Sequence, residues 1–347
     1  MLIIYGASGY TGELIARNAV HQGLHPVLAG RSAGRLAPLA QELGLEHRIF
    51  GLDDPAAIQS GLEGATVLLN ASGPFKHTAA PLVEACLRVG VHYLDLAGEV
   101  PEFEALAAQD GLASAAGVML LPGVGFGIVP TDCLAAHLKQ RLPDAGRLTL
   151  AFQAVGGVSH GTAETVIEDL PRGGVIRRNG ELVRVAAGLH TRRIDFGNGP
   201  TDTITNPWRG DISTAYHSTG IPNIEVFAVI PSPMRELMRA SRYIGPLLGT
   251  GVAQRALKRQ ALSQPLPSAA QRSAGRTLVW GEVTNRAGDR AAARLTGPEA
   301  YDFTALSAVA VAQRVLAGTA RPGFQTPARL FGPDFVLELP GVRRYAC

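Results

Sequence analysis

The sequence is poor in lysine and cysteine and contains no long apolar segment. Its 32 basic residues include 29 arginines and only 3 lysines, spread along the chain, and the formal net charge is +3. Nucleic-acid-binding proteins concentrate far more positive charge, so we expect no nucleic-acid partner. The cysteines, Cys86, Cys133 and Cys347, have neither metal-ligand spacing nor the even number of a disulfide framework. We therefore expect no metal site and a reducing, cytoplasmic compartment.

Signals for membrane insertion and for two common catalytic mechanisms are missing as well. No stretch reaches the apolar length that spans a bilayer, and the chain enters an apolar strand at once, without a basic region or a cleavage site. No tyrosine is followed four residues later by a lysine, and no His-Glu-x-x-His sequence occurs. The proton donor of short-chain dehydrogenases and the zinc site of common metalloproteases are therefore excluded.

The first dozen residues instead contain a glycine-rich turn between a strand and a helix. An apolar run from Leu2 to Tyr5 is typical of a buried parallel strand, and apolar residues recur at helical spacing from Leu14 to Gly23. The glycines between them allow a tight turn, the approach of a pyrophosphate to the backbone and close helix packing, which predicts a dinucleotide site. A glycine turn without a ligand is the alternative. The expected contacts are Gly6, Ser8, Gly9, Tyr10, Thr11 and Gly12.

The end of the second predicted strand bears on the choice of coenzyme. An NAD site would place a carboxylate there to bind the ribose 2′-hydroxyl, but the residues are Arg31 and Ser32, followed by Arg35. An arginine pairs well with a 2′-phosphate, so NADP(H) is favoured over NAD(H), with an ordinary surface arginine as the alternative. Asp53, after the third strand, is expected either near the adenine or as the cap of the helix that begins at Pro55.

Strands and helices alternate up to residue 121, which predicts an α/β fold with a doubly wound parallel sheet. We assign residues 1–130 to an NAD(P)-binding Rossmann domain and residues 131–347 to an α+β substrate and dimerisation domain with a mostly antiparallel sheet, whose tail packs back on the body. We place a glycine-rich hinge between the two domains at 122–130. Thr131 and Asp132 are expected to cap the helix that follows this hinge. Further strands are expected at 147–154, 183–185, 190–196, 212–217, 224–230, 278–283 and 291–295, and helices at 78–89, 101–116 and 298–317.

Four sequence blocks in fixed order resemble one family. They are Gly-Ala-Ser-Gly-Tyr-Thr-Gly at 6–12, Asn-Ala-Ser-Gly-Pro-Phe at 70–75, Tyr-Leu-Asp-Leu-Ala-Gly-Glu at 93–99, and the glycine-rich hinge at 122–130. Shorter likenesses follow at 279–282, 301–304 and 323–327. These blocks are similar to the saccharopine dehydrogenase-like oxidoreductases, a group that includes trans-acting enoyl reductases.

The resemblance implies a Rossmann domain, a second domain that forms substrate contacts and often a dimer surface, and hydride transfer to a C=N or C=C bond. It implies that five residues lie beside the ribose and nicotinamide, namely Ala71, Ser72, Gly73, Pro74 and Phe75. Two departures from the family pattern fall on the presumed substrate side. Phe75 replaces a frequent tyrosine, and Gly127 stands where aspartate is expected.

A proton donor is harder to select than a coenzyme site. Lys76, with His77, follows the turn at 70–75 and is a candidate to orient a substrate, or else an exposed residue at a helix start. Tyr93 and Asp95, at the end of the fifth strand, and Glu99 just after it are further candidates, with packing and helix capping as their alternative roles. His160 falls in a glycine-rich segment expected to be a loop that closes over the nicotinamide or stays exposed.

Three functions remain open from the sequence. The first is an NADPH-dependent reductase of a small or acyl substrate, the second is imine reduction or amino-acid dehydrogenation, and the third is a non-catalytic NADP(H)-binding redox sensor or partner protein. Residues 232–264 combine an apolar side with six basic residues and a single acid, Glu236. This stretch is expected to contact a membrane surface or an acyl substrate weakly, or else to form helices that cover the second domain or meet a dimer partner.

Overall fold

The computed structural model describes residues 1–155, 160–169, 171, 173–263 and 266–347. The chain forms two compact units, which are described separately. Unit 1 comprises residues 1–97, 101–127 and 301–330, and unit 2 comprises residues 98–100, 128–300 and 331–347. Residues 156–159 of the expected loop, and Gln264 at the end of the basic stretch, lie outside the described residues. Within the described part of the chain, no helix has both the length and the apolar character needed to cross a membrane.

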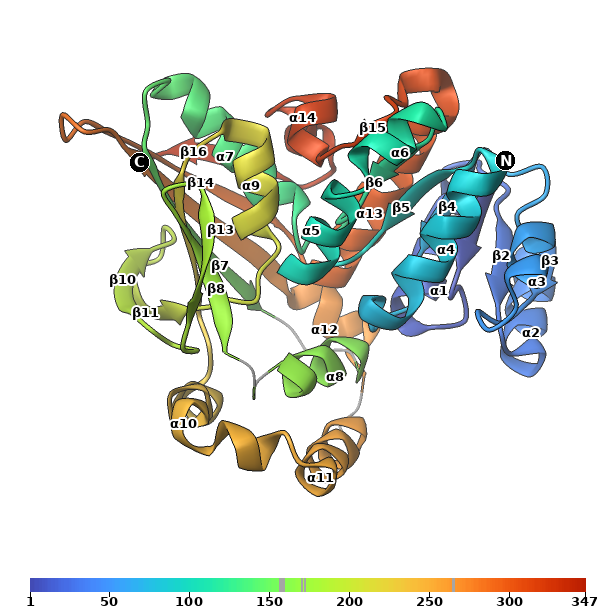
Figure 1. Cartoon of the computed structure of the whole chain (residues 1–347), viewed down its shortest axis with the longest axis horizontal. Helices are drawn as coiled ribbons and strands as arrows, with labels where there is room; N and C mark the ends of the chain where they lie inside the picture. The colour runs from blue at the N-terminus through green and yellow to red at the C-terminus, as the bar shows by residue number, and fades with distance from the viewer. Residues whose placement is uncertain (156–159, 170, 172, 264–265) are drawn as a thin grey trace. The chain divides into compact units, whose positions relative to one another are not determined.

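Unit 1 contains a seven-stranded sheet in which every neighbouring pair is parallel (Figure 1). The predicted doubly wound sheet is therefore confirmed, because the strand order reverses at β1 as in a dinucleotide-binding fold. The carboxyl tail adds a seventh strand, β15, beside β6. In spatial order the strands are β15 (Gly323–Phe324), β6 (Met119–Leu121), β5 (His92–Asp95), β4 (Val67–Asn70), β1 (Leu2–Tyr5), β2 (Val27–Gly30) and β3 (His47–Ile49).

The helices of this part differ in detail from the expected ones. The helix expected over 101–116 is split into α5 (Val100–Ala107) and α6 (Asp110–Ala115), because Gln109 N–H bonds to the carbonyl three residues back, Leu106, rather than four. The helix expected over 298–317 begins at Ala300, and its α-helical part ends at Arg314. The elements are α1 (Tyr10–His21), α2 (Ala33–Leu43), α3 (Pro55–Gly61), α4 (Phe75–Val89), α13 (Ala300–Arg314), the π-helical turn η2 (Val315–Thr319) and α14 (Pro327–Phe331).

Unit 2 is built on a mixed, mostly antiparallel sheet, as predicted. Among the neighbouring strands that the structure describes in this unit, only β7 and β12 run parallel. Strands β8 and β11 were not expected, and the tail contributes an edge strand, β16. The strands are β7 (Arg147–Val155), β8 (Gly174–Arg178), β9 (Glu181–Val185), β10 (Thr191–Asp195), β11 (Pro200–Thr205), β12 (Asn223–Ala228), β13 (Arg276–Thr284), β14 (Arg290–Pro298) and β16 (Arg343–Ala346).

Two predictions about helices in unit 2 are wrong. The strand expected over 212–217 is part of helix α9 (Asp211–Thr219), and Thr131 lies inside α7 (Val129–Arg141) instead of capping it. Both differences have one cause, since α7 and α9 pack together through buried polar side chains. Thr131 donates to the Asp211 carboxylate, and Ser218 donates to Asp132 at 2.6 Å.

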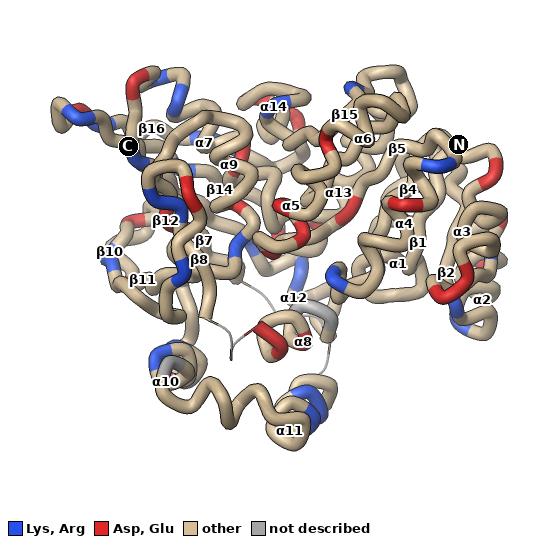
Figure 2. The backbone as a smooth tube through the Cα atoms, in the orientation of Figure 1, with Lys and Arg blue, Asp and Glu red and all other residues tan. Residues whose placement is uncertain are grey.

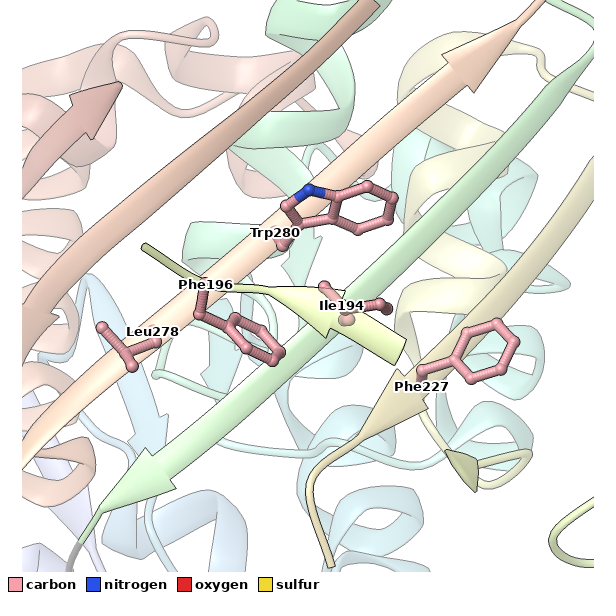
Figure 3. Packing of buried hydrophobic residues seen from close by; sticks show 6 residues of the cluster. Ile194, Phe196, Phe227, Leu278 and Trp280 are labelled. Atoms are coloured by element: carbon pink, nitrogen blue, oxygen red, sulfur yellow. The ribbon is translucent and has the colours of Figure 1, made fainter. Parts of the chain in front are cut away.

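The face of this sheet that lies away from α7 is covered by the sheet's own edge strand, β10. Ile194 and Phe196, on β10 and just after it, pack over the neighbouring strands, against Phe227, Leu278 and Trp280 (Figure 3). The remaining helices of unit 2 are α8 (His160–Asp169), α10 (Ser232–Leu248), α11 (Gly251–Leu262), α12 (Ala269–Ala274) and the 3-10 turn η3 (Phe335–Glu338).

Candidate nucleotide-binding site

The glycine turn after β1 has the shape that a pyrophosphate requires. Gly6 adopts a left-handed φ of +83°, and a Cβ atom there would lie 2.8 Å from Cβ of Ser72, so the turns after β1 and β4 meet at this glycine. A Cβ atom at Gly12 would collide with the carbonyl oxygen of Gly6. Gly9 is the N-cap residue of α1 and offers no side chain to the first-turn N–H groups. These N–H groups lack intrahelical acceptors, which suits them to phosphate oxygens.

Basic residues surround the end of β2. Arg31 is exposed directly after the strand, and Arg35, in the first turn of α2, donates from Nη2 to the carbonyl oxygen of Ser8 at 2.9 Å. Arg31, the residue expected to bind a 2′-phosphate, therefore has a second arginine near it, because Arg35 is held beside the glycine turn. Ser32 is the N-cap residue of α2, but its side chain forms no capping hydrogen bond.

Asp53 lies near this group but does not cap the next helix. Burial raises the pKa of the Tyr5 hydroxyl, and the charges of Arg31 and Asp53 act on it in opposite directions, so both lie close to the end of β1. The cap of α3 is Asp54, whose carboxylate accepts from the N–H of Ala56 at 2.9 Å. The capping alternative for Asp53 is therefore wrong, since the neighbouring acid occupies that position.

The loop after β4 is held in place by two buried side chains. Asn70 is fully buried, and its Oδ1 accepts from the N–H of Ser72 at 3.0 Å. Thr78, in the first turn of α4, accepts from Asn70 Nδ2 at 3.0 Å and donates to the carbonyl oxygen of Ser72 at 2.7 Å. Both backbone polar groups of Ser72 are thereby fixed where the loop meets Gly6.

A hydrogen-bonded chain continues from this loop to the ends of β5 and β6. Asn70 Nδ2 donates to the Tyr93 hydroxyl at 3.1 Å, and that hydroxyl donates to Asp95 Oδ2 at 2.9 Å. Asp95 Oδ1 accepts from the N–H groups of Ala97 and Gly123, both at 2.9 Å. Burial raises the pKa of Asp95 to about 6 despite these three donors, and burial also raises the pKa of Tyr93 well above its usual value.

The glycine-rich segment after β6 is fixed by helix α13, from far along the sequence. The N–H of Phe126 donates to Thr304 Oγ1 at 3.1 Å, and Ser307 donates to the carbonyl oxygen of Val124 at 2.7 Å. A Cβ atom at Gly125 would lie 2.8 Å from the Thr304 methyl carbon, so this close approach needs glycine. The end of β6 is thus rigidly positioned beside the Asp95 chain.

The start of the same helix reaches the glycine turn. The rings of Tyr10 and Tyr301 meet edge to face, with centroids 5.1 Å apart. Sequence reasoning did not select Tyr301 or Thr304 as site residues. The only signal was the family likeness of Tyr-Asp-Phe-Thr at 301–304, because nothing in the local pattern predicts a contact nearly 300 residues away.

The three residues considered as catalytic candidates have different surroundings. Lys76 is exposed in the first turn of α4, directly after the loop at 70–75. Tyr93 is fully buried, and its hydroxyl accepts from Asn70 at the start of the loop. His160 is the first residue of helix α8 in unit 2, so its expected position within a loop is wrong. Lys76 and Tyr93 lie near the carboxyl ends of the neighbouring strands β4 and β5 of unit 1. His160 belongs to unit 2.

Comparison with known families agrees with this geometry. Residues 2–121 match the family described as the saccharopine dehydrogenase NADP binding domain. The resemblance expected from the sequence is therefore confirmed for this part of the chain, and the matched region includes the glycine turn, the arginines after β2, the loop at 70–75 and Asp95.

Curated relatives match less than half of this chain. The trans-acting enoyl reductase of Mycobacterium tuberculosis is 29% identical over 153 residues, which are 42% of this chain and 37% of that protein. A putative trans-acting enoyl reductase of the same organism is 30% identical over 184 residues, which are 49% of this chain and 44% of that protein. The chain thus spans less than half the length of these relatives.

Two solved structures share the fold of the whole chain. The apo saccharopine dehydrogenase (L-Glu forming) of Saccharomyces cerevisiae superposes with a TM-score of 0.66 at 11% identity, over 100% of this chain and 99% of that one. Homospermidine synthase of Legionella pneumophila, solved in complex with NAD, gives a TM-score of 0.64 at 13% identity, over 100% of this chain and 91% of that one. At these identities the likeness concerns the fold alone.

Proposed function

We propose that the protein is an NADP(H)-dependent oxidoreductase that transfers hydride to a C=C bond of an enoyl or acyl type, or to a C=N bond. The observation that carries the proposal is the juxtaposition of the glycine turn with the loop at Ser72, within a domain of a family described as NADP-binding. The curated relatives named as enoyl reductases favour a C=C acceptor. The saccharopine dehydrogenase fold favours a C=N acceptor.

The residues of unit 1 fit a pyridine nucleotide. The first turn of α1 would bind the pyrophosphate, with hydroxyls from Ser8 and Thr11, and Arg31 with Arg35 would bind the 2′-phosphate. The nicotinamide would lie against Ala71–Phe75, whose backbone Asn70 and Thr78 hold in position. When bound, the coenzyme supplies the hydride, and the protein supplies orientation and a proton.

The choice of NADP(H) over NAD(H) is the part of the proposal tested most directly. Arg31→Ala should weaken NADPH binding by about 1.5–3 kcal/mol, the value of a hydrogen bond to a charged group, and leave NADH binding unchanged. Titration calorimetry with both coenzymes measures this. Arg321→Ala, which removes another exposed arginine of unit 1, is the control and should change neither affinity. Equal affinity of the unchanged protein for NADPH and NADH would contradict the proposed preference.

The reaction class is tested by NADPH oxidation with a panel of enoyl thioesters on one side and preformed imines, or oxo acids with amines, on the other. Turnover with one set and not the other assigns the acceptor bond. Tight NADPH binding with no turnover of either set would instead support the redox sensor or partner protein that the sequence leaves open. We further propose that the protein acts in the cytoplasm as a homodimer, which agrees with its free cysteines and with the family resemblance.

A further inference from the structure

Exposed apolar side chains gather on and just after helices α10 and α11 of unit 2. Among the described residues, 13 large apolar side chains are exposed, and six of them lie between Tyr243 and Leu266. Tyr243 and Leu247, one turn apart on α10, are 76% and 63% exposed, and Val252 at the start of α11 is 71% exposed. Scattered single residues of this kind are normal, but a cluster on one surface usually marks a contact site.

This surface is held firmly from behind. Met238 and Leu248 on the opposite side of α10 are buried in a cluster with Ala187. Helix α11 packs on α8, where Lys258 forms an ion pair with Glu168 and the Gln254 side chain donates to a backbone carbonyl of α8 at 2.9 Å. Both helices are therefore anchored by buried contacts, and their exposed side chains form what we call the outer face.

The same outer face carries positive charge. Arg255 and Arg259 on α11 are exposed and share a helix face with Val252, since these positions are three, four or seven residues apart. Neither arginine forms an ion pair within the described part of the chain, and α11 contains no acidic residue. Glu236 is the single acidic residue in the sequences of α10 and α11, and it pairs with Arg239 on α10 at 3.0 Å. Figure 2 shows basic residues on both helices.

We propose that this outer face of α10 and α11 binds the surface of an anionic lipid membrane. Exposed Tyr243, Leu247 and Val252 would enter the boundary between headgroups and acyl chains, while Arg255 and Arg259 would pair with lipid phosphates. A second copy of the chain is a poorer occupant, because a two-fold contact through this face would bring arginines against arginines. The side chain of Arg242 lies outside the described part of the structure.

The proposal does not depend on the proposed enzymatic function, since its test requires no turnover. The full-length protein is sedimented with vesicles of phosphatidylcholine alone and of phosphatidylcholine mixed with phosphatidylglycerol, at low and high salt. We expect binding only to the mixed vesicles and loss of binding at high salt. Removing both cations with Arg255→Ala and Arg259→Ala should weaken binding by about 30-fold, because each cation near an anionic surface contributes about fivefold.

Matched control variants distinguish binding through this face from nonspecific adsorption of the protein to vesicles. Arg286→Ala with Arg290→Ala removes two exposed arginines from the β13–β14 turn and should leave binding unchanged. Leu247→Ser should weaken binding by about tenfold, the effect expected for burying one leucine. Leu112→Ser is its control, because Leu112 is similarly exposed, at 66%.

Three results would overturn the proposal. The first is failure of the unchanged protein to bind the mixed vesicles at low salt. The second is equal weakening by the control variants. The third is a dimer, seen by analytical ultracentrifugation, that Leu247→Ser converts to monomer, which would assign this face to a second copy.

Discussion

Asp95 makes the stability of unit 1 depend on pH in an unusual direction. Its pKa of about 6 in the folded protein exceeds the ordinary value of 3.8 because burial disfavours the carboxylate more than three hydrogen-bond donors favour it. A raised pKa means that the folded state binds a proton which the unfolded state has already lost. The free energy of unfolding therefore falls as the pH rises from about 4 through about 6, and stays low above that range.

The size of the effect follows from the difference in pKa. About 2 units separate the two values, which corresponds to about 3 kcal/mol at roughly 1.4 kcal/mol per unit. Most of this, about 2 kcal/mol, falls between pH 4.5 and 7.5. Asp95→Asn keeps the shape of the side chain and an oxygen for the N–H groups of Ala97 and Gly123, but carries no charge at any pH. The variant should therefore become more stable relative to the unchanged protein by about 2 kcal/mol over that interval.

Native-state hydrogen exchange measures this difference for each unit separately. Peptides that contain β4 and β5 report on Asp95, and peptides that contain β13 report on unit 2 as an internal control. Comparing the two proteins at the same pH cancels the intrinsic pH dependence of exchange and the contributions of other groups. Tyr93→Phe should enlarge the pH effect, because it removes the donor to Asp95 Oδ2. A stability difference between the unchanged protein and Asp95→Asn that is the same at both pH values would refute the reasoning.

Three further substitutions test the site. Gly12→Ala should destabilise the protein by about 1–3 kcal/mol in thermal unfolding, because its methyl group would collide with a backbone oxygen, whereas Gly34→Ala, with open space around it in α2, should stabilise by up to about 1 kcal/mol. Asp54→Ala should cost about 1 kcal/mol through loss of the α3 cap, and Asp53→Ala should leave the melting temperature unchanged. Ser72→Leu should weaken NADPH binding more than about tenfold without changing the circular dichroism spectrum, because its side chain points toward Gly6; undiminished binding would show that the nicotinamide lies elsewhere.

The first half of the fold was predictable because its signals are local. Leu2–Tyr5 and Val67–Asn70 are short apolar runs that end at polar or glycine turns, and fully buried parallel strands have this pattern. Unit 2 was harder. Residues 212–217 include β-favouring side chains such as Ile212, Thr214 and Tyr216, but they form a helix whose first turn buries Ser213 and Thr214, an outcome that depends on tertiary packing.

The candidate site, like the fold, was predictable only where its signals are local in the sequence. Its glycines and the loop at 70–75 follow from sequence motifs, whereas the partners of Tyr93 do not. Periodicity predicts that Tyr93 is buried at the end of a strand, but a strand pattern contains no information on which buried amide or carboxylate meets its hydroxyl. The clamp from Thr304 and Ser307 was missed for a related reason, since it joins residues more than 170 positions apart.

Residues 323–346 give a strand to each sheet, β15 beside β6 and β16 beside β14. During synthesis on a ribosome, neither sheet can therefore be completed until these residues have emerged. Helix α13, which fixes the glycine-rich segment of unit 1, emerges only shortly before them. A fragment that stops at residue 127 would leave the β6 edge open and Gly125 without Thr304. Each unit is assembled from segments far apart in the sequence, so the two are best produced, permuted or fused only as one piece.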